Sequence, residues 1–141
     1  MKWITWQNVG VDRMACAWLI RKHVDPKAEF TFIPEGQTPP PKAGEPFDIP
    51  GVRFSHHKGH CSFHTFLDQH KLNDPVLRHI ARIIDEADTV QEASVEPVAA
   101  GLDLICRGIR RVSKDDEEAL QRGVMVYEAL YAELAVDPRQ E

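Results

Sequence analysis

Residues 34–46 restrict the fold of this chain more than any other segment, because five of them are prolines. Residues 39–41 are three consecutive prolines, and two glycines interrupt the rest of the segment. Proline lacks the N–H that a helix requires and clashes with the preceding turn, so no helix can cross this segment. We predict a plain surface loop here, with a flexible lid as the alternative.

The part of the chain before this loop combines short strands with one apolar helix. Residues 3–6 and 29–33 are rich in aromatic and β-branched side chains, which favour strands. Gly10 ends the first strand. Residues 12–24 then form a helix whose first half is apolar on nearly every side, a pattern typical of a buried helix.

Two more short strands are predicted directly after the loop, at residues 47–49 and 52–56. Pro50 and Gly51 separate them. Alternation along the second strand places His56 on the same apolar face as Phe54. His56 is therefore expected to point inward.

The second half of the chain is helical by its spacing of apolar residues. We predict a short helix at 62–70, followed by three longer ones. Their expected apolar stripes are Val76, Leu77, Ile80, Ile83, Ile84 and Ala87; Val95, Val98, Leu102, Ile105 and Ile109; and Leu120, Val124, Tyr127, Tyr131 and Leu134.

The helix caps follow known residue preferences. Asp74 caps the first of the longer helices, with proline directly after it, and Ser113 caps the last, with Asp116 three residues on. Strands early and helices later indicate an α+β fold, a helix-rich single domain over residues 1–141 with a small sheet in its N-terminal half. Residues 136–141 are expected to be a frayed tail.

Composition excludes several classes of protein. The chain is 43% hydrophobic and 28% charged, ordinary values for a globular domain of 141 residues. A net charge of −5 argues against nonspecific nucleic-acid binding, which needs a basic face. No stretch approaches the about 20 apolar residues of a membrane span. Three widely spaced cysteines favour free thiols in a reducing compartment, so we expect a cytoplasmic protein without membrane or direct nucleic-acid contacts.

Five of the seven histidines lie between residues 56 and 70, and Cys61 lies among them. Imidazole and thiolate are ligands of zinc, iron and similar divalent metals. His56 and Cys61 are the preferred ligands, and His60 and His64 are weaker ones. Solvated loop histidines are the alternative interpretation. Cys61 is also a candidate reactive thiol, because a helix N-terminus can lower a thiol pKa.

Two further groups contain acids. Asp12 and Arg13 begin the buried helix, where free N–H groups and the guanidinium would suit an anion; a simple N-cap role for Asp12 is the alternative. Asp85 and Asp88 lie near the buried stripe of their own helix, where a carboxylate needs a partner such as a metal, a histidine or Arg13. Capping of the helix end is the other role open to them.

Four segments, in order along nearly the whole chain, carry a family resemblance. They are residues 10–21 with Asp25-Pro26, residues 54–56 with 61–63, residues 84–88, and residues 127–131. The chain resembles the C-terminal domain family of the chromate-resistance protein ChrB. His64 stands where the family pattern has an acid. The resemblance implies a role in bacterial chromate resistance, alongside a regulatory or sulfurtransferase-like partner protein.

These observations favour a binding domain. We expect Asp12, Arg13, His56, Cys61 and one or both of Asp85 and Asp88 to line a pocket for a divalent metal, an oxyanion such as chromate, or both. The acids would repel an anion, which favours the metal. A small metal- or thiol-dependent enzyme is one alternative. A protein-partner module that uses the late helices is another, and it would expose an apolar patch.

Overall fold

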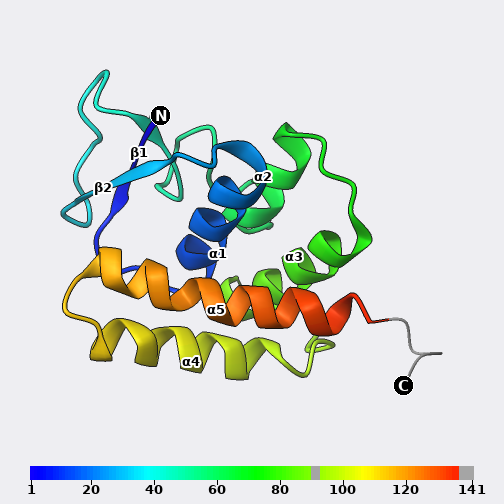
Figure 1. The fold of residues 1–141 in the computed structure, drawn as a ribbon. Helices are drawn as coiled ribbons and strands as arrows, with labels where there is room; N and C mark the ends of the chain where they lie inside the picture. The colour runs from blue at the N-terminus through cyan, green and yellow to red at the C-terminus, as the bar shows by residue number, and fades with distance from the viewer. Residues whose placement is uncertain (90–92, 137–141) are drawn as a thin grey trace.

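The fold places a small parallel sheet and four helices around one buried helix (Figure 1). The computed structural model describes residues 1–89 and 93–136. The strands are β1 (Lys2–Trp6), β2 (Glu29–Ile33) and β3 (Glu45–Pro46), and the helices are α1 (Val11–Leu19), a π-helical continuation η1 (Ile20–Val24), α2 (Ser62–Gln69), α3 (Pro75–Asp88), α4 (Ala99–Val112) and α5 (Asp116–Leu134). The α+β fold is therefore confirmed.

The sheet has the order β2-β1-β3 and both of its strand pairs are parallel. Lys2 pairs with Glu29 and Trp6 with Ile33, so β1 and β2 match along their full length. Parallel neighbours need a crossover, and α1 with η1 supplies it. Pro46 lies in an edge strand, where a missing N–H is tolerated.

Helix α1 forms the centre of the core, as its sequence predicted. All of its residues except Arg13 are buried. Trp18 stacks on Phe63 of α2 and on Tyr127 of α5, with ring centroids 6.4 Å and 5.8 Å apart. The helix thereby joins α2 to α5, and its first turn faces the pocket described below.

The predicted strands at 47–49 and 52–56 are wrong. The segment contains one isolated bridge, between Phe47 and Phe54. Asp48 has φ = 51° and Gly51 has φ = 88°, values that break an extended strand. The loop expected at 34–46 is confirmed up to Gly44, and its last two residues form β3.

Three helix boundaries also differ from expectation. Gly10, not Asp12, is the N-cap residue of α1. Asp115, not Ser113, caps α5 by accepting a hydrogen bond from Glu118 N at 2.9 Å. Helix α4 begins at Ala99, four residues after Val95, the residue at which its expected apolar stripe begins.

The buried face of α4 was also assigned incorrectly. Its buried residues are Ala99, Leu102 and Cys106, whereas Val98 and Ile105 are exposed. Within residues 1–89 and 93–136, no helix combines the length and hydrophobicity needed to cross a bilayer. Of the tail expected to fray, residues 137–141 lie outside the described part of the chain.

Candidate functional site

Asp12 lies in the first turn of α1, but its carboxylate caps a different helix. Oδ2 accepts the N–H of Ser62 at 2.7 Å and Oδ1 accepts the N–H of Phe63 at 2.9 Å. These are free N–H groups at the start of α2, where the helix dipole favours an anion. Asp12 is only 2% exposed, so its carboxylate is held rigidly at the base of the site.

Asp48 adds a second carboxylate that our sequence analysis missed. Ser62 Oγ donates to its Oδ1 at 2.7 Å, and Arg13 Nε lies 3.0 Å from its Oδ2. The left-handed backbone at Asp48 turns this side chain toward Asp12. Aspartate tolerates that conformation better than most residues, and the Pro50-Gly51 turn nearby was the available signal.

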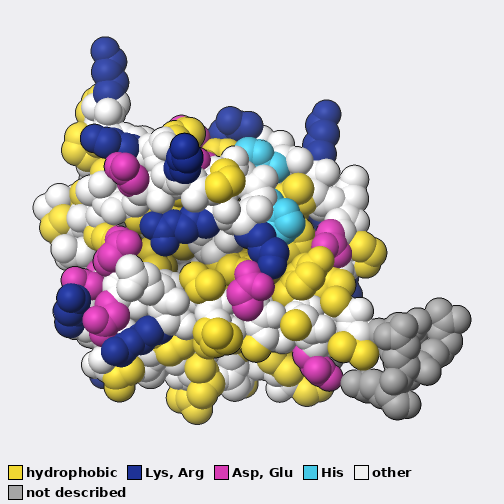
Figure 2. All heavy atoms as spheres, viewed as in Figure 1, with side chains coloured by type: hydrophobic (Ala, Val, Ile, Leu, Met, Phe, Trp, Pro, Cys, Tyr) yellow, Lys and Arg dark blue, Asp and Glu magenta, His cyan; other side chains and the backbone are white. Residues whose placement is uncertain are grey.

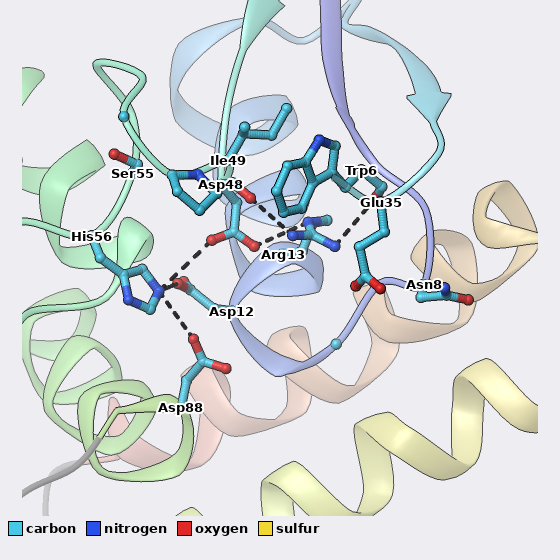
Figure 3. A pocket seen from close by; sticks show the side chains of 13 residues that line it. Trp6, Asn8, Asp12, Arg13, Glu35, Asp48, Ile49, Ser55, His56 and Asp88 are labelled. Atoms are coloured by element: carbon cyan, nitrogen blue, oxygen red, sulfur yellow. Dashed lines mark hydrogen bonds and ion pairs between the residues drawn. The ribbon is translucent and has the colours of Figure 1, made fainter. Parts of the chain in front are cut away.

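His56 connects the carboxylates. Its Nε2 atom lies 3.1 Å from Asp12 Oδ2, 3.1 Å from Asp88 Oδ2 and 3.8 Å from Asp48 Oδ1 (Figure 3). One ring nitrogen carries at most one proton, so it can donate to only one of these acids at a time. The ligand atoms of Asp12, Asp48 and His56 all lie within 4.8 Å of one another.

The proton affinities of the site reflect this crowding. Burial, together with the charge of Asp12, raises the pKa of Asp48 to about 7, although Arg13 opposes the shift. Hydrogen bonds to Asp12 and Asp88 raise the pKa of His56 to about 10. Burial also raises the pKa of Asp88. The crowded carboxylates therefore favour protonation, and Asp48, His56 and Asp88 keep their protons to a higher pH than they would in water.

Arg13 is already occupied by the protein itself. Nη2 donates to the Asp48 carbonyl at 2.8 Å, and Nη1 donates to the carbonyls of Trp6 and Gln7 at 3.3 Å. Its Nε forms an ion pair with the Asp48 carboxylate without the alignment of a hydrogen bond. The guanidinium thus balances one acid of the site, and most of its N–H groups point to protein acceptors.

A cavity of about 480 Å³ opens beside these groups. Its lining includes four acids, Asp12, Asp48, Asp88 and Glu35, against Arg13 and His56. Glu35 comes from the proline-rich loop, which Trp6 Nε1 holds by donating to the Gln37 carbonyl at 2.7 Å. The cavity is consequently acidic, and it is far larger than a single ion.

The remaining predicted residues form a separate group. Asp85 accepts the Cys61 N–H at 2.7 Å and lies 2.8 Å from His60 Nδ1, while the His60 and His64 rings stack 4.0 Å apart. The Cys61 thiol is buried and faces the Ala81 carbonyl. Burial raises the pKa of this thiol, the direction opposite to that of an activated nucleophile.

Comparison with known proteins decides the family. A family model described as ChrB, C-terminal domain, matches residues 3–134. The chain belongs to the ChrB C-terminal domain family. Protein ChrB of Cupriavidus metallidurans is 32% identical over 141 residues, an alignment that covers 99% of this chain and 42% of that protein. This ChrB domain thus spans less than half the length of that relative. No solved structure matches it at a significant level.

Membership in the ChrB family confirms the resemblance found in the sequence. The family match extends over residues that build the site, from Asp12 in α1 to Asp88 at the end of α3. The site therefore lies within the matched part of the chain.

Proposed function

We propose that this ChrB-family domain binds a divalent metal ion through Asp12, Asp48, His56 and Asp88. The observation that carries the proposal is the arrangement of three carboxylates around one imidazole nitrogen, at 3.1 Å, 3.1 Å and 3.8 Å. A single proton cannot satisfy these groups together, whereas a cation at their centre would. Metal–ligand bonds of about 2.0–2.2 Å require only small movements of side chains that are already this close.

The donor set indicates the class of metal. Three carboxylates and one imidazole suit Mn²⁺, Fe²⁺ or Zn²⁺ better than a soft ion that prefers thiolate. The Cys61 thiol is buried in the neighbouring group, which supports a site without sulfur. An oxyanion alone would face the acidic lining, with Arg13 already paired to Asp48, so we do not favour direct chromate binding.

Titration calorimetry with metal tests this proposal directly. Protein purified without a histidine tag is stripped with chelator and titrated with Mn²⁺ or Zn²⁺. We expect one ion per chain, with an affinity reduced by about 100-fold or more in His56→Ala and Asp88→Asn. His57→Ala is the matched control, since His57 is an exposed neighbour bonded to the Arg53 carbonyl. Equal binding by all four proteins, or none by the wild type, would refute the site.

The size of the cavity favours catalysis as a second candidate function. A metal held by the four residues would leave room in the 480 Å³ cavity for water and a small substrate, bounded by Trp6, Asn8 and Glu35. A metal with an open position can lower the pKa of bound water or polarise a substrate. The buried Cys61 gives no comparable support to a thiol mechanism.

A further inference from the structure

The cavity beside the proposed metal site has a second end that the metal does not use. In Figure 3, Arg13 separates His56 from a group formed by Trp6, Asn8 and Glu35. All of these residues line the same cavity of about 480 Å³. A cavity of that volume suits a small molecule rather than an ion alone. Trp6, Asn8 and Glu35 are named the distal group below.

The loop that carries Glu35 is fixed beside the Trp6 ring. The Gln37 N–H donates to the Pro34 carbonyl at 3.1 Å, which closes a tight turn around Glu35. Gly36 has φ = 89°, the positive φ that the third position of a type II turn requires. Trp6 Nε1 donates to the Gln37 carbonyl at 2.7 Å. The turn and the indole therefore hold each other in place before any ligand binds, as a preorganised site requires.

The side chains of the distal group lack partners within the described chain. The Glu35 carboxylate makes no hydrogen bond or ion pair with residues 1–89 or 93–136, and no ring or cation of those residues stacks on the Trp6 indole. Asn8 is held by its backbone, whose N–H donates to Asp116 Oδ2 at 3.2 Å. A carboxylate and an indole face together suit an organic cation, through charge-assisted hydrogen bonds and cation–π attraction.

The charges of the cavity indicate the same ligand, in a step that rests on the proposed function. The two positive charges of a divalent ion and the one of Arg13 balance the three aspartates of the lining, with His56 neutral as a metal ligand. Glu35 is then the one uncompensated charge among the residues that line the cavity. A ligand with a single positive charge at that end would complete the balance.

We infer that the cavity binds a small molecule with an ammonium group at one end, which contacts Trp6 and Glu35, and a metal-binding group at the other. The probes are alkyl hydroxamic acids of increasing chain length, each paired with an analogue in which an ammonium replaces the terminal methyl. The hydroxamate binds the metal in both members of a pair, so their difference in affinity reports the distal group. In calorimetry on the Mn²⁺-loaded domain, the ammonium member should bind about tenfold more tightly at the best chain length.

Substitutions in the distal group test which side chains cause this preference. Glu35→Gln should abolish it while Mn²⁺ still binds. Glu29→Gln is the matched control and should retain it, because Glu29 is an exposed residue of β2 outside the cavity. Trp6→Phe and Trp6→Leu both lose the hydrogen bond to Gln37, but only phenylalanine keeps a ring face. The preference should therefore be larger in Trp6→Phe than in Trp6→Leu.

Nonspecific binding to the exposed apolar side of α4 cannot imitate the expected preference. Figure 2 shows hydrophobic side chains gathered along the lower edge of the molecule, where α4 runs. Leu104 and Ile105 of this helix are 70% and 55% exposed. Such a surface would favour the methyl member of each pair, which is the direction opposite to the one expected.

The outcomes separate this inference from the proposed function. Mn²⁺ binding without a preference for the ammonium member, or a preference that Glu35→Gln retains, overturns the inference and leaves the metal site standing. If the domain binds no metal, butylammonium titrated into the metal-free protein decides the inference by NMR chemical shifts, with butanol as the uncharged control. Binding of butylammonium that Glu35→Gln weakens and Glu29→Gln does not supports the cation position. No binding, or equal binding by the two variants, overturns it.

Discussion

At the scale of single residues, Asp12 has two roles that depend on the same atoms. Its oxygens accept the N–H groups of Ser62 and Phe63, and Oδ2 also faces His56. The helix contacts hold the carboxylate in place before any ligand arrives, which is how a site is preorganised. Asp88 allows the capping role to be separated from the contact with His56. Its carboxylate also contacts His56, but the side chain is 32% exposed.

Asp12→Asn is expected to destabilise the metal-free fold by about 2–3 kcal/mol, because a buried charged acceptor of two backbone N–H groups is lost. Asp88→Asn should change the stability by less than about 0.5 kcal/mol, since it removes charge repulsion together with one contact of His56. Urea unfolding in the presence of chelator measures both variants. Similar losses in the two would contradict the capping role of Asp12.

Sequence reasoning identified Asp12 and Asp88 through correctly predicted helices, and His56 through the clustering of histidines, although the strand predicted for His56 is wrong. Asp12 and Asp88 belong to helices recognised from their apolar spacing, so their positions followed from those helices. Asp48 was missed because residues 47–49 alternate like a strand, whereas a positive φ redirects the side chain. Cys61 was considered as a thiol at a helix N-terminus, and in the fold burial outweighs the dipole. The local sequence pattern thus reveals neither the geometry of the turn at Asp48 nor how deeply the Cys61 thiol is buried.

At the scale of whole elements, the start of α5 shows how neighbouring polar residues compete for one cap. Ser113 was the expected N-cap residue, but its Oγ donates to the Ile109 carbonyl at 2.6 Å and so closes α4. Asp115 accepts the Glu118 N–H, and Glu118 Oε1 in turn accepts the Lys114 N–H at 3.3 Å. The short loop between the two helices therefore ends one helix with Ser113 and starts the next with Asp115.

Asp115→Ala should lower the free energy of unfolding by about 1 kcal/mol, the usual loss for an N-cap acceptor. Ser113→Ala, at the residue that the sequence favoured, should lower it by about 0.5 kcal/mol or less, because it loses a single bond at a helix end. Chemical denaturation of both variants in parallel compares them. A larger effect at Ser113 would reverse the assignment.

The helical pattern also failed for α4, for a reason that belongs to the element. The helix has two apolar sides, and hydrophobic periodicity does not say which one faces the core. Leu102 and Cys106 are buried, while Ile105, expected in the same buried stripe as Leu102, is exposed. Packing within the described part of the chain therefore accounts only for the buried side of this pattern.

At the scale of the whole molecule, the fold assembles the site from distant parts of the chain. Helix α1 supplies Asp12, the turn after β3 supplies Asp48, the segment before α2 supplies His56, and the last residue of α3 is Asp88. The parallel crossover through α1 and the packing of α2 and α3 around it bring these segments together. Sequence analysis could propose that such residues converge, but tertiary packing decides which of them do.

The charge of the assembled site should make stability depend on pH in a way that metal reverses. Folding raises the pKa of Asp48 from 3.8 to about 7 and that of His56 from 6.5 to about 10. The folded state therefore binds these protons more tightly than the unfolded chain. The resulting stability is present at low pH and is lost as the pH rises through the folded-state values. In chelator, the melting temperature should fall from about pH 4 to about pH 10, first as Asp48 and then as His56 loses its proton.

A divalent ion takes the place of those protons, so its binding releases protons and strengthens as the pH rises. Metal at 100 times its Kd adds about 2.7 kcal/mol, which corresponds to a melting temperature about 10 °C higher for a domain of this size. Melting curves with chelator and with Mn²⁺ across the same pH range should diverge toward alkaline pH. In His56→Ala the two curves should stay close together, whereas His57→Ala should behave like the wild type. A metal-induced rise that is the same at every pH would show that the ion binds elsewhere than at the protonated pair of His56 and Asp48.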